Sequence, residues 1–129
     1  IERHGLGDRV RLIGALPHVD LPALLGAADV MALASASEGL ANAWVEALAC
    51  GTPIVITDAG GAAEVVTEPH YGRIVPRTAK AFARAIADLL VHPPEQSAVR
   101  RGAEHFTWGT NSVTLFAHLD ALVAAHRRD

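Results

Sequence analysis

The amino-acid sequence predicts an α/β domain of three layers, in which helices cover both faces of a mainly parallel sheet of about four strands. Strand and helix patterns alternate four times along the chain, which is typical of a doubly wound parallel sheet. Two of the predicted strands, residues 29–34 and 53–57, are almost uniformly apolar, as expected for strands covered on both faces. With 129 residues, 50% of them hydrophobic, the chain can build a core, and residues 1–129 are treated as one domain.

Each predicted element depends on apolar spacing and on signals at its ends. Gly5 ends a helix tail, Asp20 and Thr78 are predicted N-caps, and Pro93 stops the helix that Thr78 begins. The predicted strands cover residues 10–13, 29–34, 53–57 and 73–76. The predicted helices cover residues 21–28, 41–50, a short turn at 62–66, 79 up to the prolines, 95–106 and 107–127.

The most informative stretch is SASEGLANAWVEALACGTP, residues 35–53, which we predict to be a strand exit, a polar loop, a helix and a turn into the next strand. It carries two glutamates, Glu38 and Glu46, with seven residues between them. Asn42 and Glu46 are spaced i, i+4 and therefore share one helix face. The opposite, core-facing stripe is predicted to consist of Trp44, Val45, Leu48 and Ala49.

This combination indicates a ligand that carries both phosphates and hydroxyls. The N-terminus of a helix has unpaired N–H groups and a partial positive charge, which suit a phosphate. Carboxylates repel a diphosphate but accept hydrogen bonds from hydroxyls, and a nucleotide sugar has hydroxyls on its ribose and on its sugar. Asn42 has two open interpretations, a ligand contact or a polar residue that satisfies helix-end donors.

Two further loops are expected at the same edge of the sheet, because the carboxyl ends of parallel strands meet there. Residues 14–17 follow the first predicted strand, and either line the ligand crevice or form a simple turn into the next helix. Gly60 and Gly61 follow the third strand and permit backbone conformations that other residues resist. Glu64, just beyond them, either binds ligand or favours the first helical turn, and we favour the structural role.

These residues resemble the C-terminal domain of family 4 retaining glycosyltransferases, which have the GT-B fold with Rossmann-like domains. Glu38 and Glu46 match the family's Glu-x7-Glu motif, and Gly60, Gly61 and Glu64 match its Gly-Gly-x-x-Glu turn. The resemblance extends from about Asp8 to Trp108.

The resemblance implies a role for each matching position. Glu38 would contact hydroxyls of the donor sugar and orient it, without being assigned as a nucleophile, and Glu46 would bind the ribose. The main chain of residues 39–42 would approach the diphosphate and sugar. The implied donor-binding positions are Gly14, Leu16, Gly39, Leu40, Ala41, Asn42, Glu46, Gly60 and Gly61.

The resemblance also implies an incomplete, N-terminally truncated domain. The family's C-terminal domain usually opens with a Gly-Arg strand and a Lys that neutralise the donor diphosphate, and no such pair is found here. We therefore expect little transferase activity from the isolated chain. In the family, the missing strands would separate the predicted strands at residues 10–13 and 29–34. Either residues 10–13 therefore lie next to residues 29–34, or another chain occupies the position of the missing strands. We expect self-association through the exposed sheet or the last helix.

Composition excludes several other classes. The net charge of −3 argues against a nucleic-acid partner, and no apolar run approaches the length of a membrane span. The polar start lacks a secretory pattern and the single Cys50 is expected to be a buried hydrophobe, which together predict a cytoplasmic protein, at most peripheral to a membrane. Seven histidines show no metal-ligand spacing, and His18, beside the predicted donor loop, is the one chosen for testing.

The sequence thus predicts part of a hexosyltransferase that binds a nucleotide-diphosphate sugar and serves glycan biosynthesis. The acceptor would be a glycan, a lipid or a small molecule, and neither a metal nor a cofactor is expected. Two alternatives stay open, a sugar-nucleotide epimerase-like domain and a non-catalytic nucleotide-binding or assembly module.

Overall fold

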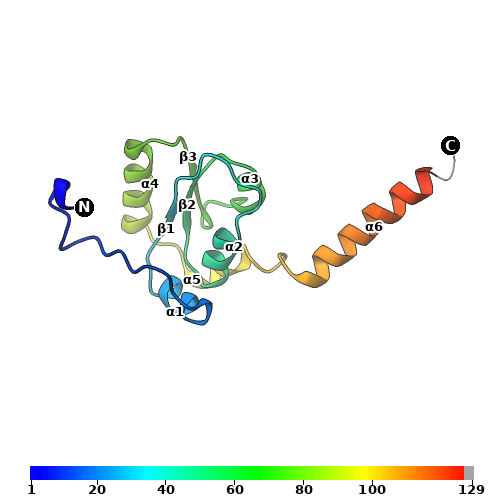
Figure 1. Cartoon of the computed structure of the whole chain (residues 1–129), viewed down its shortest axis with the longest axis horizontal. Coiled ribbons are helices and arrows are strands. Elements are labelled where there is room, and N and C mark those ends of the chain that lie inside the picture. Colours follow the sequence, from blue (N-terminus) through cyan, green and yellow to red (C-terminus); the bar gives the residue numbers. More distant parts are fainter. Residues whose placement is uncertain (127–129) are drawn as a thin grey trace.

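Three parallel strands form the centre of the structure, a computed structural model that describes residues 1–126. They are β1 (Met31–Leu33), β2 (Ile54–Thr57) and β3 (Gly72–Val75), in the order β1-β2-β3 (Figure 1). Met31 lies opposite Ile54, which in turn lies opposite Gly72. Because all three strands run the same way, their carboxyl ends meet at one edge of the sheet.

Helices cover both faces of this sheet, which confirms the predicted three-layer α/β/α architecture. Ile54 and Ile56 of β2 pack into a core beneath α2 (Asn42–Ala49), α3 (Ala62–Val65) and α5 (Gln96–Arg101). Val55 points to the other face, where it packs against α4 (Ala79–Val91). All four residues of β2 are buried, as their apolar sequence predicts.

The two predicted N-caps have different outcomes. At Thr78, φ −131° and ψ 145° give the extended geometry of a cap, and the Thr78 hydroxyl accepts a hydrogen bond from the Ala81 N–H. Asp20 makes no such bond before α1 (Leu21–Gly26). The prediction was wrong because Asp20 already belongs to a 3-10 turn, η2 (His18–Asp20), and has helical angles of −90° and −16°.

The predicted strand at residues 10–13 is absent, so the sheet has three strands rather than about four. A 3-10 turn, η1 (Glu2–His4), ends at Gly5 as expected, and the chain then continues without regular structure to Pro17. Leu12 and Ile13 are 86% and 58% exposed. An extended segment becomes a strand only when its N–H and C=O groups pair with a neighbour, and within residues 1–126 no strand pairs with this segment.

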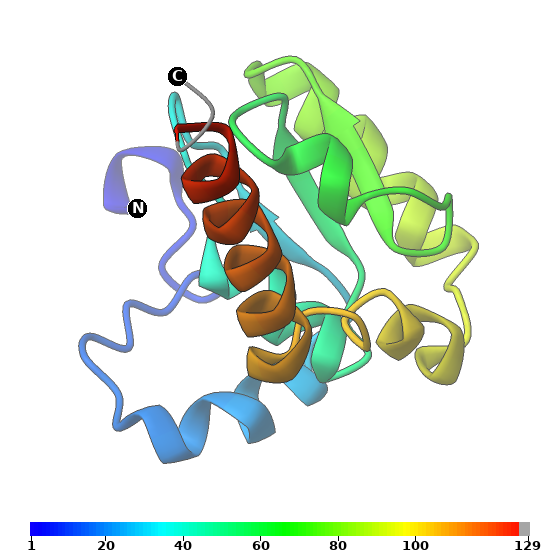
Figure 2. The same ribbon diagram turned by 90° about the vertical axis from the view of Figure 1, so that its right-hand side faces the viewer.

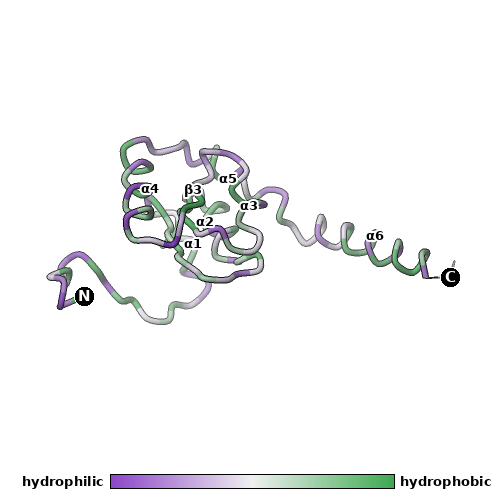
Figure 3. Tube along the Cα trace, turned by 90° about the horizontal axis from the view of Figure 1, so that it is seen from above, coloured by the Kyte–Doolittle hydropathy of each residue, from purple (hydrophilic) through white to green (hydrophobic). Residues whose placement is uncertain are grey.

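The last helix, α6 (Trp108–His126), projects away from the body (Figure 1), and in Figure 2, which is viewed from that side, it lies in front of the body. None of its residues is buried, although hydrophobic residues recur along it (Figure 3). The prediction extended this helix to Arg127, which lies outside the described residues. The preceding helix, α5, is shorter than the predicted 95–106. Within residues 1–126, no helix is both long enough and apolar enough to cross a membrane.

Candidate functional site

The predicted motif helix is α2, flanked by Ala41 and Cys50, so its predicted bounds are confirmed to within a residue. Its buried side chains are Trp44, Ala47 and Leu48. The predicted core stripe is right at Trp44 and Leu48, but Ala49 is exposed and Val45 is only half-buried. The buried face of α2 therefore consists of Trp44, Ala47 and Leu48, which have i, i+3, i+4 spacing, and it excludes Ala49.

Glu38 is fixed from the edge of the sheet. The Ser35 hydroxyl donates to Glu38 Oε1 over 2.5 Å, and the Thr57 hydroxyl donates to the Ser35 carbonyl over 2.6 Å. Thr57, at the end of β2, therefore fixes the backbone of Ser35, and the Ser35 side chain fixes one oxygen of the Glu38 carboxylate. The second oxygen, Oε2, makes no hydrogen bond within residues 1–126.

The Gly-Gly turn lies directly against this loop. Gly60 has φ +52°, and a Cβ atom there would overlap the carbonyl oxygens of Glu38 and Gly39. The Gly61 N–H donates to the Gly39 carbonyl over 2.8 Å. The structure thus brings Glu38, Gly39, Gly60 and Gly61 together from two loops, and only glycine permits the close approach at position 60.

A row of free backbone donors lies at the N-terminal end of α2. Within residues 1–126, the N–H groups of Gly39, Leu40, Ala41 and Asn42 donate to no protein acceptor. Asn42 does not cap the helix with its side chain, because Ala41 is the N-cap residue and no side-chain cap bond forms. Four consecutive amides and the amide side chain of Asn42 are thus available to an outside group.

Glu46 borders two hollows beside α2. One, of about 390 Å³, also contains Asn42, which confirms that the two share a helix face. Its far wall includes Trp108 and Asn111, and Trp108 is 85% exposed. The sequence analysis did not identify Trp108 and Asn111 as site residues, because both fall within the predicted last helix, to which it gave only a structural role. The signal that could have identified Trp108 is a large aromatic residue at the start of a helix.

The second hollow, of about 150 Å³, lies between α1 and α2. Its walls are mainly apolar, from Leu21, Pro22 and Leu25. His18 and Glu46 lie at its edge, with His18 Nε2 3.3 Å from Glu46 Oε1. His18 is thus the histidine that meets the motif.

The remaining predicted residues have mixed positions. Gly14 and Leu16 lie in the irregular segment that leads to His18, and neither forms a hydrogen bond to the motif loop within the described part of the chain. Glu64 lies in the first turn of α3 and is exposed. Across residues 1–126, no three His, Cys, Asp or Glu side chains are grouped so that they could hold a metal ion.

Comparison with known proteins identifies a glycosyltransferase family along most of the chain. Residues 1–106 match the family model described as glycosyl transferases group 1. The chain is 34% identical over 128 residues to D-inositol 3-phosphate glycosyltransferase of Salinispora tropica, which covers 95% of this chain and 27% of that protein. It is 32% identical over 124 residues to GDP-mannose-dependent alpha-(1-6)-phosphatidylinositol monomannoside mannosyltransferase of Mycolicibacterium smegmatis, covering 86% of this chain and 32% of that protein.

The fold also matches a solved structure, that of sucrose-phosphate synthase from Thermosynechococcus elongatus. The TM-score is 0.83 with 30% sequence identity, over 96% of this chain and 33% of that one. The chain therefore spans about a third or less of the proteins it matches, and has the α/β architecture of GT-B glycosyltransferases. On the family match and these identities, the chain belongs to the group 1 glycosyl transferases.

Proposed function

We propose that this chain binds the nucleotide-diphosphate part of a sugar donor, and that the protein containing it transfers a hexose to an acceptor hydroxyl with retention of configuration. The observation that carries this proposal is the row of four unengaged amides at residues 39–42, flanked by Glu38 and Glu46. Amides at a helix N-terminus bind phosphate oxygens, and the flanking carboxylates accept hydrogen bonds from hydroxyls.

Each side chain has a distinct part in this proposal. Glu38, with Oε1 held by Ser35, offers Oε2 to the hydroxyls of the donor sugar and orients it. Glu46, whose side chain is 38% exposed, accepts from the ribose hydroxyls. The loop through Gly14 and Leu16, which leads to the His18–Glu46 contact, would line the base. Gly60 and Gly61 hold the amide row in place, and neither glutamate acts as a nucleophile.

We propose further that the isolated chain turns over little donor. The departing nucleotide diphosphate gains negative charge in the transition state, and preorganised cations or donors must stabilise it. Residues 35–53 contain no Lys or Arg. A helix N-terminus contributes only about 0.3–1 kcal/mol at an exposed site, which is far below what a cationic clamp supplies. Binding, rather than turnover, is therefore the appropriate test for this chain.

Thermal stabilisation by nucleotide sugars tests the proposal directly. UDP-glucose, UDP-N-acetylglucosamine, ADP-glucose and GDP-mannose are compared on the wild-type chain, on Glu46→Ala and on Glu68→Ala. Glu68 is an exposed glutamate outside the motif and serves as the matched control. A donor present at about ten times its Kd stabilises by about 1.4 kcal/mol. We expect one donor to raise Tm by a few degrees in the wild type and in Glu68→Ala but not in Glu46→Ala.

The other outcomes discriminate between functions. Stabilisation that persists in Glu46→Ala, or its absence with every nucleotide, would contradict the proposed donor site. Equal stabilisation by a donor and by its free nucleotide diphosphate would favour a nucleotide-binding module without sugar recognition. Epimerisation of the donor without an acceptor would favour the epimerase alternative.

A further inference from the structure

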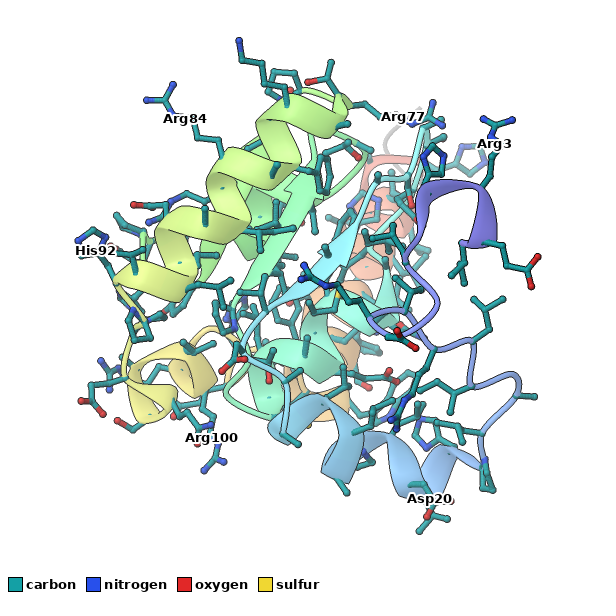
Figure 4. The ribbon with its side chains drawn as sticks, turned by 90° about the vertical axis from the view of Figure 1, so that its left-hand side faces the viewer. Arg3, Asp20, Arg77, Arg84, His92 and Arg100 are labelled. Atoms are coloured by element: carbon teal, nitrogen blue, oxygen red, sulfur yellow. The ribbon has the colours of Figure 1, made fainter. Side chains whose placement is uncertain are left out.

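Side chains at the ends of the other two strands hold the backbone just after β1. The Thr57 hydroxyl, at the end of β2, donates to the Ser35 carbonyl over 2.6 Å. Arg77, which follows β3, donates from Nε to the Ala34 carbonyl over 3.0 Å and so reaches across to the end of β1 (Figure 4). Thr57 is only 4% exposed, so its hydroxyl is shielded from competing water. Two consecutive carbonyls are thus fixed at the point where the loop to Glu38 begins.

Ser35 connects this fixed backbone to the side chain of Glu38. A serine hydroxyl has one proton to donate, and here it donates to Glu38 Oε1 over 2.5 Å. An O–H···O distance this short is typical of a bond to an ionised carboxylate, which is about twice as strong as a bond between neutral groups. Because Oε1 is held from a fixed backbone, Oε2 is held in place as well, and it makes no hydrogen bond within residues 1–126.

The backbone of Glu38 is held separately from its side chain. A Cβ atom at Gly60 would lie 2.1 Å from the Glu38 carbonyl oxygen, and the Gly61 N–H donates to the Gly39 carbonyl over 2.8 Å. Neither contact involves the Ser35 side chain. Removing the Ser35 hydroxyl should therefore release the Glu38 side chain, while the row of free amides at the start of α2 stays in place.

We infer that Ser35 and Thr57 are positioning residues, which fix the Glu38 side chain in one conformer with Oε2 open to a ligand. The role of this conformer in sugar recognition rests on the proposed function, whereas the conformer itself does not. A glutamate that is free at χ1 and χ2 has three staggered wells at each torsion, so it adopts a given conformer about a tenth of the time. Recognition of the donor sugar by Oε2 therefore weakens by up to about tenfold when the Ser35 hydroxyl is lost, and binding of the nucleotide part does not change.

The conformer of Glu38 is measured without a ligand, from nuclear magnetic resonance three-bond coupling constants across χ1 in the isotope-labelled chain. We expect one conformer in the wild type, averaging over several conformers in Ser35→Ala, and one conformer again in Ser35→Thr, which keeps the hydroxyl. Ser37→Ala is the matched control, because Ser37 is an exposed serine of the same loop. A single conformer in Ser35→Ala, or equal averaging in Ser37→Ala, would overturn the inference.

Calorimetric titration then measures sugar recognition as a ratio of two dissociation constants, that of a nucleotide sugar over that of its free nucleotide diphosphate. The probes are UDP-glucose with UDP, ADP-glucose with ADP, and GDP-mannose with GDP. For the pair that the wild type binds, we expect Ser35→Ala to raise this ratio by about three- to tenfold, with the Kd of the free nucleotide diphosphate unchanged. Ser35→Thr and Ser37→Ala should keep the wild-type ratio.

Thr57 is tested with the same ratio. Thr57→Val replaces the hydroxyl by a methyl group, so the Ser35 carbonyl loses its donor. This variant should raise the ratio, but by less than Ser35→Ala, because the hydroxyl that donates to Glu38 is still present. Thr57→Ser keeps the hydroxyl and should keep the wild-type ratio. A wild-type ratio in Thr57→Val would contradict the role of Thr57.

The outcomes separate this inference from the proposed function. If Glu38→Ala raises the ratio and Ser35→Ala does not, the donor site stands and the positioning role fails. If Ser35→Ala weakens the nucleotide sugar and the free diphosphate equally, Ser35 has only a structural role and the inference also fails. If the wild type binds none of the probes, the proposed function fails, and the coupling constants alone decide whether Ser35 positions Glu38.

Discussion

Replacing Gly60 by alanine is expected to destabilise the protein by about 2–3 kcal/mol. An L-residue at φ +52° costs about 1–2 kcal/mol. The added Cβ would also overlap the carbonyl oxygens of Glu38 and Gly39, so the motif loop must shift. That shift breaks the 2.8 Å hydrogen bond from the Gly61 N–H to the Gly39 carbonyl, at a further cost of about 1 kcal/mol. For a chain of 129 residues the sum corresponds to a fall in Tm of about 10 °C.

Two glycines provide matched controls. Gly14 has φ +70°, but no heavy atom of residues 1–126 lies within 4 Å of a Cβ built there, so Gly14→Ala carries only the conformational cost. Gly39 has neither a left-handed backbone nor a close neighbour, so Gly39→Ala should be nearly neutral. Urea denaturation of the three variants gives the comparison. If Gly60→Ala is no more destabilising than Gly14→Ala, the close approach of the two loops is not a determinant of stability.

Three further predictions concern the rest of the fold. Thr78→Ala should lower the free energy of unfolding by about 1 kcal/mol through loss of the α4 cap, whereas Thr78→Ser should retain most of it, as measured by urea denaturation. Leu48→Ala should cost about 2–5 kcal/mol because Leu48 is fully buried, while Leu119→Ala on the exposed α6 should stay within about 0.5 kcal/mol in the same assay; similar losses would contradict the burial pattern. The pKa of Asp88 is held below its ordinary value of 3.8, mainly by the hydrogen bond from Arg73, so its contribution to stability is complete above that value and is lost as pH falls through the lower folded-state pKa. The difference in urea midpoint between wild type and Asp88→Asn should therefore shrink on acidification, and a difference that grows at low pH would refute the assignment.

The central part of the fold could be predicted because its signals are local. Strands β1 and β2 are apolar, and α2 and α4 have clear helical spacing. The prediction that both strands are covered on both faces is right for β2 but wrong for β1, in which Ala32 is exposed. The cap at Thr78 could also be predicted, because the hydroxyl of a threonine just before a periodic helix can accept a hydrogen bond from an N–H of the first turn. At Asp20 the same rule failed, since the 3-10 turn that precedes α1 takes the cap residue out of extended geometry.

The strand predicted at residues 10–13 failed for a different reason. Apolar residues there, among them Leu12 and Ile13, fit a strand locally, but pairing depends on a neighbour that local sequence cannot specify. The convergence of the motif loop and the Gly-Gly turn was predicted from the rule that parallel strands end at one edge. Glu46 contacts His18 and shares a hollow with Trp108, and both residues come from segments distant in the sequence. Their positions beside α2 depend on the tertiary fold, which the local spacing of residues does not specify.

The alternation of side chains along β2 has a consequence for how the protein opens. Ile54 and Ile56 belong to one core and Val55 to the other, and β2 is hydrogen-bonded on both edges. Neither layer of helices can detach without exposing this strand, so we expect the two helix layers and the sheet to unfold together. The amide protons of residues 54–57 are therefore the last to exchange with deuterated solvent, and their exchange measures global unfolding.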